Sequence, residues 1–358
     1  MTKDLFASCR VGELEFQNRV VMAPMTRSRA IGNIPNALMA EYYGQRATAG
    51  LIITEGTTPA PEGLGYARIP GIYSDAQIAG WKLVADAVHA SGGRIFVQLM
   101  HTGRVGHPAN LPEGAEMLAP SALAAAGEMW TDAQGMQPHP VPRAMTELEI
   151  QRTIEAFAQG ARNGIAAGLD GVELHGANGY LLEQFFHPAT NLRTDTWGGD
   201  FRGRGRFILE VAKASAQAIG AGRVGIRLSP HGVFNDMAPY AETQEAYTWL
   251  AGELGKLGLA YLHVVDHSPM GAPAVPEATK EAMRVAFHGA VILSGGYDRP
   301  RAEADLAAGK GELVAFGRPF IANPNLAARL QQNAPLREPD AATFYTPGAA
   351  GYTDYAVA

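Results

Sequence analysis

The chain has 358 residues, of which 47% are hydrophobic and 18% charged, a composition typical of a globular enzyme. Its formal net charge of -6 argues against a nucleic-acid-binding protein, which would usually be basic. The single cysteine, Cys9, excludes an internal disulfide framework, a four-thiolate iron–sulfur cluster and a thiolate-rich zinc site. Because the sequence shows neither a secretory leader pattern nor an apolar run of about 18 residues, we expect a cytoplasmic protein that does not enter membranes.

Short aliphatic runs alternate with longer amphipathic stretches along the chain. The short runs lack strict alternation of polar and apolar residues, as expected for parallel strands that are covered on both faces. We predict strands at Arg19–Ala23, Leu51–Glu55, Ile95–Leu99, Gly171–His175, Val224–Leu228, Tyr261–Val265, Val291–Ser294 and Val314–Gly317. We predict helices at Asp75–Ala90, Glu147–Ala167, Arg204–Ile219, Thr243–Leu257, Pro276–Phe287 and Arg299–Ala308.

Eight strands with intervening helices, and no break in composition between them, predict an α/β fold with one (β/α)₈ barrel domain over residues 1–358. Residues 1–18 are expected to cap the bottom of this barrel. The segment 101–145 after the third strand is long and rich in Ala, Gly and Pro, which is typical of a functional loop, and we interpret it as a lid over the barrel mouth. Thr146 and Glu149 form a capping-box pattern that marks the start of the next helix.

Polar side chains follow the predicted strands where the barrel mouth should lie. The fourth strand ends at His175 and is followed by Asn178 and Tyr180. His175 and Asn178 could hold one oxygen by hydrogen bonds, and the Tyr180 phenol could give up a proton. Catalytic residues of barrel enzymes occupy such strand ends. A histidine with satisfied hydrogen bonds and two ordinary loop residues is the alternative interpretation.

Glycine-rich turns follow the last two predicted strands. They read Ser294-Gly295-Gly296 and Gly317-Arg318. Backbone N–H groups in turns at these two positions are a recurrent phosphate site of barrels, and a guanidinium adds a bidentate partner for the same anion. One glycine pair alone would be weak evidence, but the two pairs together predict a phosphate-binding site.

Several longer motifs occur in one order along the chain. They include Asn18–Arg27, Glu41–Ala47, Gln98–Arg104, His175–Leu182, Asn191–Gly199, Phe316–Pro324 and Phe344–Tyr355. With these motifs the chain resembles the Old Yellow Enzyme family of FMN-dependent ene-reductases over nearly its whole length. The resemblance implies noncovalent FMN at the barrel mouth and NADPH or NADH as the electron donor. Thr26 in place of a cysteine resembles the branch of the yeast and enterobacterial enzymes.

The resemblance also implies roles for individual residues toward the flavin. Thr26 would donate a hydrogen bond to flavin O4, Gln98 would bind the pyrimidine edge, and Arg227 would lie where negative charge gathers on reduction. A structural ion pair of Arg227 is the alternative. The full cofactor set comprises Pro24, Met25, Thr26, Gly56, Gln98, His175, Arg227, Ser294, Gly295, Gly296, Gly317 and Arg318.

On the substrate side, the resemblance implies that His175 and Asn178 bind the activating oxygen of an enone, enal or nitroalkene, and that Tyr180 donates the proton. Tyr66, Met100 and Tyr345 would line the substrate cavity, although Tyr66 and Tyr345 could equally be packing aromatics. Met100 stands where many relatives carry tryptophan, so we expect a roomier pocket. The segment Asp200–Arg206 departs from the family pattern, which puts the capping of its helix in doubt.

Other function classes compete with this interpretation. FMN barrels that oxidise 2-hydroxy acids or dihydroorotate need a His or Cys base in a different local context. A metal-dependent barrel hydrolase is conceivable with ten histidines, but no His-x-His follows the first strand, and we predict no metal site. A noncatalytic flavin-binding or scaffold protein is the third alternative. The sequence is compatible with a monomer or a dimer.

Overall fold

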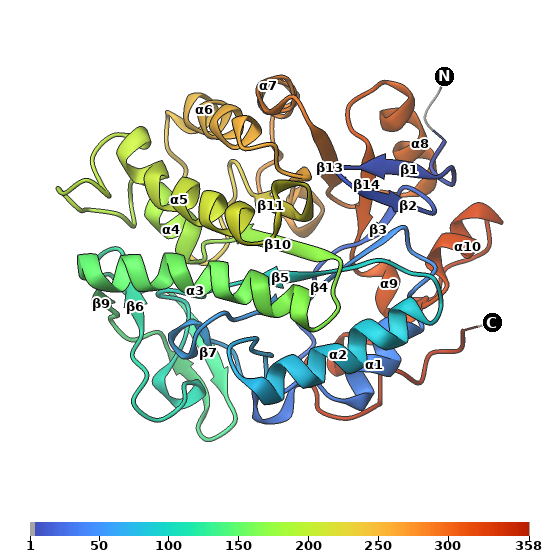
Figure 1. The fold of residues 1–358 in the computed structure, drawn as a ribbon, viewed down its shortest axis with the longest axis horizontal. Coiled ribbons are helices and arrows are strands. Elements are labelled where there is room, and N and C mark those ends of the chain that lie inside the picture. Colours follow the sequence, from blue (N-terminus) through green and yellow to red (C-terminus); the bar gives the residue numbers. More distant parts are fainter. Residues whose placement is uncertain (1–3, 358) are drawn as a thin grey trace.

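A closed barrel of eight parallel strands forms the centre of the computed structural model, which describes residues 4–357 (Figure 1). The strands are β3 (Val20–Met22), β4 (Leu51–Thr57), β5 (Ile95–Leu99), β10 (Gly171–Gly176), β11 (Val224–Leu228), β12 (Tyr261–Val265), β13 (Ala290–Ser294) and β14 (Leu313–Phe316). β14 pairs with β3, and all the neighbouring strands are parallel. The predicted barrel is therefore confirmed, with strand ends shifted by only one or two residues.

The six predicted helices are present as α2 (Asp75–His89), α3 (Glu147–Ala166), α5 (Phe201–Ile219), α6 (Thr243–Lys256), α7 (Glu277–Phe287) and α8 (Arg299–Ala307). Four short helices were not predicted, namely α1 (Ala37–Gly44), α4 (Leu181–Phe186), α9 (Pro319–Ala322) and α10 (Leu326–Gln331). All six residues of α4 are buried, so it lacks the one-sided apolar stripe by which a helix is recognised. Single 3₁₀ turns occur at Ile31–Asn33, Pro61–Gly63, Pro108–Asn110, Ala221–Arg223, Ser268–Met270 and Ala341–Thr343.

The helix whose capping was in doubt has a regular N-cap. The Asp200 carboxylate accepts hydrogen bonds from the N–H groups of Arg202 and Gly203, each at 3.0 Å. As a result α5 begins at Phe201, three residues before the predicted start. The doubt about this segment is therefore removed, because Asp is itself a good N-cap residue.

An N-terminal hairpin covers the end of the barrel opposite the polar strand ends. Its strands are β1 (Cys9–Val11) and β2 (Leu14–Phe16), which pair antiparallel. Val11 and Phe16 pack with Leu51, Phe96 and Tyr261 in one buried cluster inside the barrel. In Figure 1 the hairpin and β7 lie on opposite sides of the molecule. The expected bottom cap is thus confirmed for residues 4–18, while residues 1–3 lie outside the described part of the chain.

The excursion over residues 101–145 contains its own small sheets. β6 (Leu118–Ala119) pairs with β9 (Arg143–Ala144), and β7 (Glu128–Thr131) forms a hairpin with β8 (Gly135–Pro138). The buried Arg104 side chain donates hydrogen bonds to the carbonyl oxygens of Ala124, Asn235 and Asp236. The base of the excursion is therefore fixed to the loop that follows β11.

The C-terminal segment is held against the first strand end by buried arginines. Arg27 donates to the carbonyl oxygen of Gly351 at 2.7 Å, and Arg29 donates to that of Phe344 at 2.7 Å. The rings of Tyr42 and Tyr352 stack at 3.9 Å between centroids. Because these contacts lie on both sides of Tyr345 in sequence, they fix that residue next to the barrel mouth.

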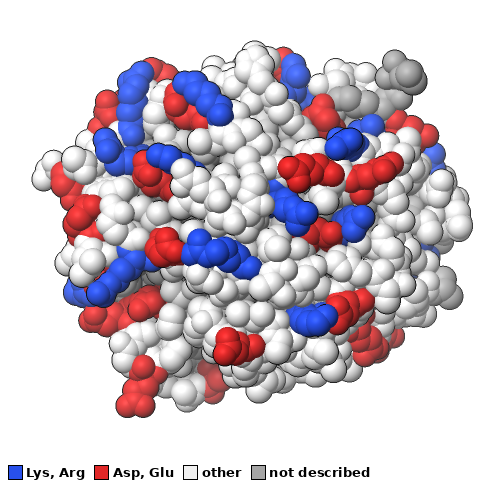
Figure 2. All heavy atoms as spheres, in the orientation of Figure 1, with Lys and Arg blue, Asp and Glu red and all other residues white. Residues whose placement is uncertain are grey.

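The surface carries no large field of one sign on the face shown in Figure 2, where basic and acidic side chains are interspersed. Within the described residues, no helix combines the length and the apolar character that a membrane crossing requires. The same residues contain no group of three or more His, Cys, Asp or Glu side chains placed to hold a metal ion.

The capping box predicted from the sequence is present at the start of α3, which offers a test of the fold. Thr146 Oγ1 accepts from the Glu149 N–H, and the Glu149 carboxylate accepts from the Thr146 N–H at 2.8 Å. We expect Thr146→Ala to lower the free energy of unfolding by about 1 kcal/mol, because the Glu149 N–H loses its acceptor and the Glu149 carboxylate loses the hydroxyl donor. Urea unfolding measures this difference. Thr146→Ser keeps the hydroxyl and should stay close to the wild type, and equal losses in the two variants would contradict the capping role.

Candidate active site

The register of the barrel brings polar side chains of neighbouring strands together. His175 on β10 is paired with Arg227 on β11, and Arg227 is paired with His263 on β12. Two residues earlier on β10, Glu173 is paired with Gln98 on β5. Because side chains alternate along a strand, Glu173 and His175 share one face, and all five residues are buried. The structure therefore assembles the predicted residues Gln98, His175 and Arg227.

Glu173, which was not among the predicted residues, forms the base of this cluster. Its carboxylate accepts a hydrogen bond from Gln98 Nε2 and lies 2.8 Å from His263 Nδ1. This hydrogen bond from Nε2 fixes the orientation of the Gln98 amide, so that its Oε1 is available to accept a hydrogen bond from a ligand. Burial lowers the pKa of His263 although Glu173 opposes the shift, so the ring is neutral at neutral pH.

Arg227 has no protein partner within residues 4–357. Its side chain makes neither a hydrogen bond nor an ion pair, and its Nε is buried and unsatisfied. Burial lowers the pKa of Arg227 from its ordinary value, while the nearby Glu173 opposes the shift. A guanidinium keeps its charge in proteins, and a buried charge without hydrogen bonds is costly. This side chain is therefore placed to bind an acceptor or an anion, and the alternative of a structural ion pair is not observed.

His175 is likewise without a hydrogen-bond partner in the described chain, and its Nδ1 is buried. Burial in the first place, and then Arg227 and His263, hold the pKa of His175 well below its usual range. The ring is consequently neutral and offers one N–H donor. A satisfied structural histidine, the alternative left open by the sequence, does not fit this environment.

The turn after β10 carries Asn178 and Tyr180 in a constrained conformation. Asn178 and Gly179 both have positive φ, 60° and 72°. A Cβ on Gly179 would lie 2.8 Å from the Phe234 carbonyl oxygen, so no larger residue fits this turn without a shift. The Asn178 N–H donates to Ser229 Oγ at 2.9 Å, and Asn235 Nδ2 donates to the Asn178 carbonyl at 2.6 Å.

Tyr180 lies beside His175 in an edge-to-face arrangement with 4.8 Å between the ring centroids. Its hydroxyl is 2.9 Å from the hydroxyl of Tyr66. Burial raises the pKa of Tyr180, so its phenol is protonated at neutral pH. Tyr66 thus contacts the predicted proton donor directly. Tyr345 is 61% exposed at the edge of the same region, and its carbonyl accepts from Arg68 at 2.9 Å.

Met100 is buried and belongs to a small apolar cluster with Tyr180, Val105 and Met129. A Cβ on Gly56 would lie 2.5 Å from Met100 Sδ. The missing side chain at Gly56 therefore makes room for the thioether, a neighbour that sequence reasoning had not connected with this glycine.

The first strand end contributes Pro24, Met25 and Thr26, all half-buried. The Thr26 hydroxyl makes no hydrogen bond to any described residue. The turn after β14 is open, because nothing lies closer than 3.8 Å to a Cβ built on Gly317. Arg318 is exposed and lacks an ion-pair partner in the described chain.

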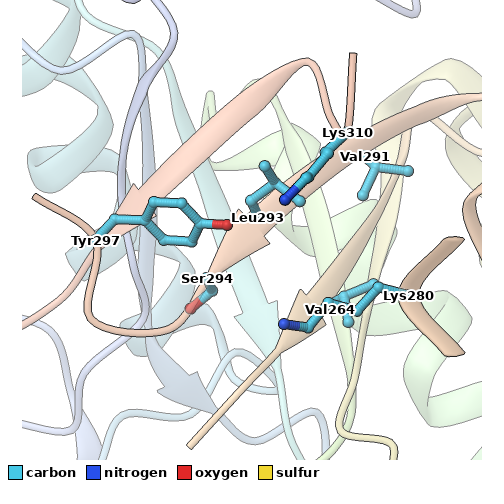
Figure 3. A pocket seen from close by; sticks show the side chains of 7 residues that line it. All are labelled: Val264, Lys280, Val291, Leu293, Ser294, Tyr297 and Lys310. Atoms are coloured by element: carbon cyan, nitrogen blue, oxygen red, sulfur yellow. The ribbon is translucent and has the colours of Figure 1, made fainter. Parts of the chain in front are cut away.

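The turn after β13 is tight, with φ of 140° at Gly295 and 62° at Gly296. The Ser294 side chain lines a cavity of about 20 Å³ that also contacts Lys280 and Lys310 (Figure 3). Both lysines already pair with carboxylates, those of Asp266 and Asp305, at 2.8 Å. This cavity is therefore no second anion site, and any phosphate contact at this turn would use backbone N–H groups.

Several residues of the site escaped sequence reasoning. Ser229 directly follows β11, and Asn235 lies further along the same loop, where no sequence pattern indicates its contact with Asn178. Glu183 lies on the unpredicted helix α4. His267 follows β12, and its Nε2 is 2.7 Å from Asn178 Oδ1. His267 was recognised from the sequence as a polar residue at the end of the sixth strand, but without a role, and Ser229 could have been found in the same way because it directly follows β11.

Known proteins resemble this chain over its whole length. A profile of the NADH:flavin oxidoreductase / NADH oxidase family matches residues 4–337. The chain is 45% identical to chanoclavine-I aldehyde reductase of Penicillium roqueforti (strain FM164), with 99% of this chain and 96% of that protein covered. It is 42% identical to a probable flavin mononucleotide-dependent alkene reductase of Leishmania infantum, with 96% and 95% covered.

Among solved structures, that of morphinone reductase superposes with a TM-score of 0.96 at 45% identity, covering 99% of this chain and 96% of the other. The matched profile and the shared barrel show the family and the fold. The chain belongs to the NADH:flavin oxidoreductase / NADH oxidase family, that of Old Yellow Enzyme, and is a flavin-dependent NAD(P)H oxidoreductase.

Proposed function

We propose that the protein is an FMN-dependent ene-reductase that uses NAD(P)H to reduce C=C bonds activated by a carbonyl or nitro group. The observation that carries this proposal is the pairing, in register, of an unpartnered buried guanidinium at Arg227 with an unpartnered neutral imidazole at His175. The first needs an acceptor or anion, and the second offers a hydrogen-bond donor. The 42% identical relative from Leishmania infantum, a probable flavin mononucleotide-dependent alkene reductase, supports the same activity.

The residues of the barrel mouth fit FMN. Arg227 would face the part of the ring where negative charge gathers on reduction, and the free Oε1 of Gln98 would accept from the pyrimidine N–H. The unengaged Thr26 hydroxyl would donate to flavin O4. The flavin ring would be bordered by Pro24, Met25 and Gly56. The phosphate would be held by the Arg318 guanidinium and by the backbone N–H groups near Ser294, Gly295, Gly296 and Gly317. When bound, FMN would supply hydride transfer between NAD(P)H and the alkene.

The substrate side uses the turn after β10. His175 and Asn178 would donate hydrogen bonds to the carbonyl or nitro oxygen, which polarises the double bond and stabilises the negative charge that develops there. As hydride reaches the β-carbon, Tyr180 would transfer its proton to the α-carbon, so that one hydride and one proton saturate the bond. The resulting phenolate would regain a proton through the Tyr66 hydroxyl at 2.9 Å.

The substrate cavity would be bordered by Tyr66, Met100 and Tyr345. Met100 is unbranched and flexible, which favours tolerance of bulky substituents. Electron donor and alkene would occupy this cavity in turn, because both would have to reach the bound cofactor beside His175. The mechanism is therefore of the ping-pong type.

The buried side chain of Glu183 stabilises the turn that carries Asn178 and Tyr180. Glu183 accepts from the Gly179 N–H at 2.6 Å, from Ser229 Oγ at 2.9 Å and from the Tyr247 hydroxyl at 2.5 Å. Burial raises the pKa of Glu183 to about 7, although the three donors oppose the shift. Since Ser229 also accepts from Asn178 N–H, Glu183 fixes the backbone that carries both Asn178 and Tyr180.

Anaerobic spectroscopy tests the proposed activity. The purified protein should be yellow, lose its colour on addition of NADPH or NADH, and regain it when 2-cyclohexenone is added. A colourless protein, a flavin that NAD(P)H never bleaches, or a bleached flavin that the enone cannot reoxidise would each contradict the proposal.

Replacement of the proton donor should separate the two half-reactions. In Tyr180→Phe we expect enone-dependent reoxidation of the flavin to slow by 10²-fold or more, which is the usual contribution of a general acid. Reduction by NADPH needs no proton from Tyr180 and should change by less than about threefold. Stopped-flow absorbance measures both rates. Equal slowing of the two half-reactions would show that the tyrosine shapes the pocket instead of donating the proton.

The raised pKa of Glu183 predicts a pH-dependent stability. A carboxyl whose pKa is about 7 when folded, against 4.5 as its ordinary value, binds its proton more tightly in the folded state. Its contribution is full below about pH 4.5 and is lost as pH rises through 7. We therefore expect Glu183→Gln to reduce the fall in unfolding free energy between pH 5 and pH 8, measured by urea unfolding. Glu155→Gln on the exposed face of α3 should leave the slope unchanged; an unaltered slope in Glu183→Gln would contradict the shift.

A further inference from the structure

The Asn178 side chain has one hydrogen-bond partner among the described residues, His267. The distance between His267 Nε2 and Asn178 Oδ1 is 2.7 Å. The main chain of Asn178 is held by other groups, Ser229 and Asn235. The position of the turn and the orientation of the Asn178 amide are therefore set by different residues.

The amide orientation matters because its two ends have opposite character. Rotation by 180° exchanges the NH₂ donor for the oxygen acceptor at almost the same shape. Only the NH₂ end can hold the oxygen of a carbonyl or nitro group. The observed arrangement directs Oδ1 to His267, which leaves Nδ2 available on the other side.

The protonation state of His267 favours this orientation of the Asn178 amide. Burial lowers the pKa of His267 to about 4, and Arg227 adds to the shift while Asp266 opposes it. The ring is therefore neutral at neutral pH and carries one N–H, which must be at Nε2 if Asn178 Oδ1 is the acceptor. The Phe234 ring packs against His267 with 4.3 Å between centroids and limits its rotation.

We propose that His267 is a positioning residue: by donating from Nε2 to Asn178 Oδ1, it holds the Asn178 amide with its NH₂ group toward the substrate oxygen. The inference rests on the proposed function, since it presupposes the oxygen clamp of His175 and Asn178. It gives the end of β12 a part in substrate binding although His267 itself need not touch the substrate.

The test titrates the FMN-loaded protein with p-hydroxybenzaldehyde, whose phenolate oxygen is a probe for the clamp. His267→Phe keeps a flat ring against Phe234 but loses the donor, and we expect about tenfold weaker binding, as for one lost hydrogen bond. The KM for 2-cyclohexenone should rise by a similar factor. His267→Gln retains an N–H donor and should recover most of the affinity. FMN content, read from the absorbance spectrum, checks that each variant is folded.

A double-mutant cycle separates amide positioning from a general structural effect. In the Asn178→Ala background, His267→Phe should cause no further loss of phenol affinity, because the amide it positions is absent. Unchanged affinity of His267→Phe, no recovery in His267→Gln, or an equal loss in the Asn178→Ala background would overturn the inference. If the wild-type protein neither binds the phenol nor reduces the enone, the proposed function itself fails, which is a distinct result.

Discussion

The site depends on a buried positive charge, that of Arg227, with which no residue between 4 and 357 forms an ion pair or a hydrogen bond. Arg227 lies near the carboxyl end of β11, where the register places it between His175 and His263. The nearest carboxylate, that of Glu173, is already engaged by Gln98 and His263. Burying a guanidinium without hydrogen bonds costs free energy, so we expect a ligand that supplies an acceptor to stabilise the barrel. In the proposed function, the flavin would supply this acceptor.

The candidate site residues near Arg227 lie partly on strands and partly on a turn, and the two groups are held in place in different ways. The strands set the positions of Gln98, His175 and Arg227 within the barrel wall, where each is fixed by paired neighbours. Asn178 and Tyr180 instead lie on a turn with two residues of positive φ. Such a turn is strained for asparagine, and Glu183, Ser229 and Asn235 hold it by hydrogen bonds. Functional groups on a loop thus gain the precision of groups on a strand.

The strands and their polar ends could be predicted from the sequence because both signals are local. Buried parallel strands read as short aliphatic runs, and a polar residue directly after such a run must lie at the barrel mouth. Parts of the site that depend on contacts between distant segments left no local signal. Asn235 contacts Asn178 across 57 positions in the sequence. Glu183 lies on a helix buried on every side, so it showed no amphipathic period. Asp200 was doubted only because it departs from a family pattern, although an aspartate is chemically suited to cap a helix.

A crystal structure of the FMN-loaded protein with bound p-hydroxybenzaldehyde tests the central claim most directly. We expect Arg227 to hydrogen-bond to the flavin ring and the phosphate to lie on the turns at Gly296 and Gly317. The phenol oxygen should lie within hydrogen-bond distance of both His175 and Asn178. A flavin bound elsewhere, an Arg227 still unpaired beside it, or a phenol oxygen away from His175 and Asn178 would contradict the account.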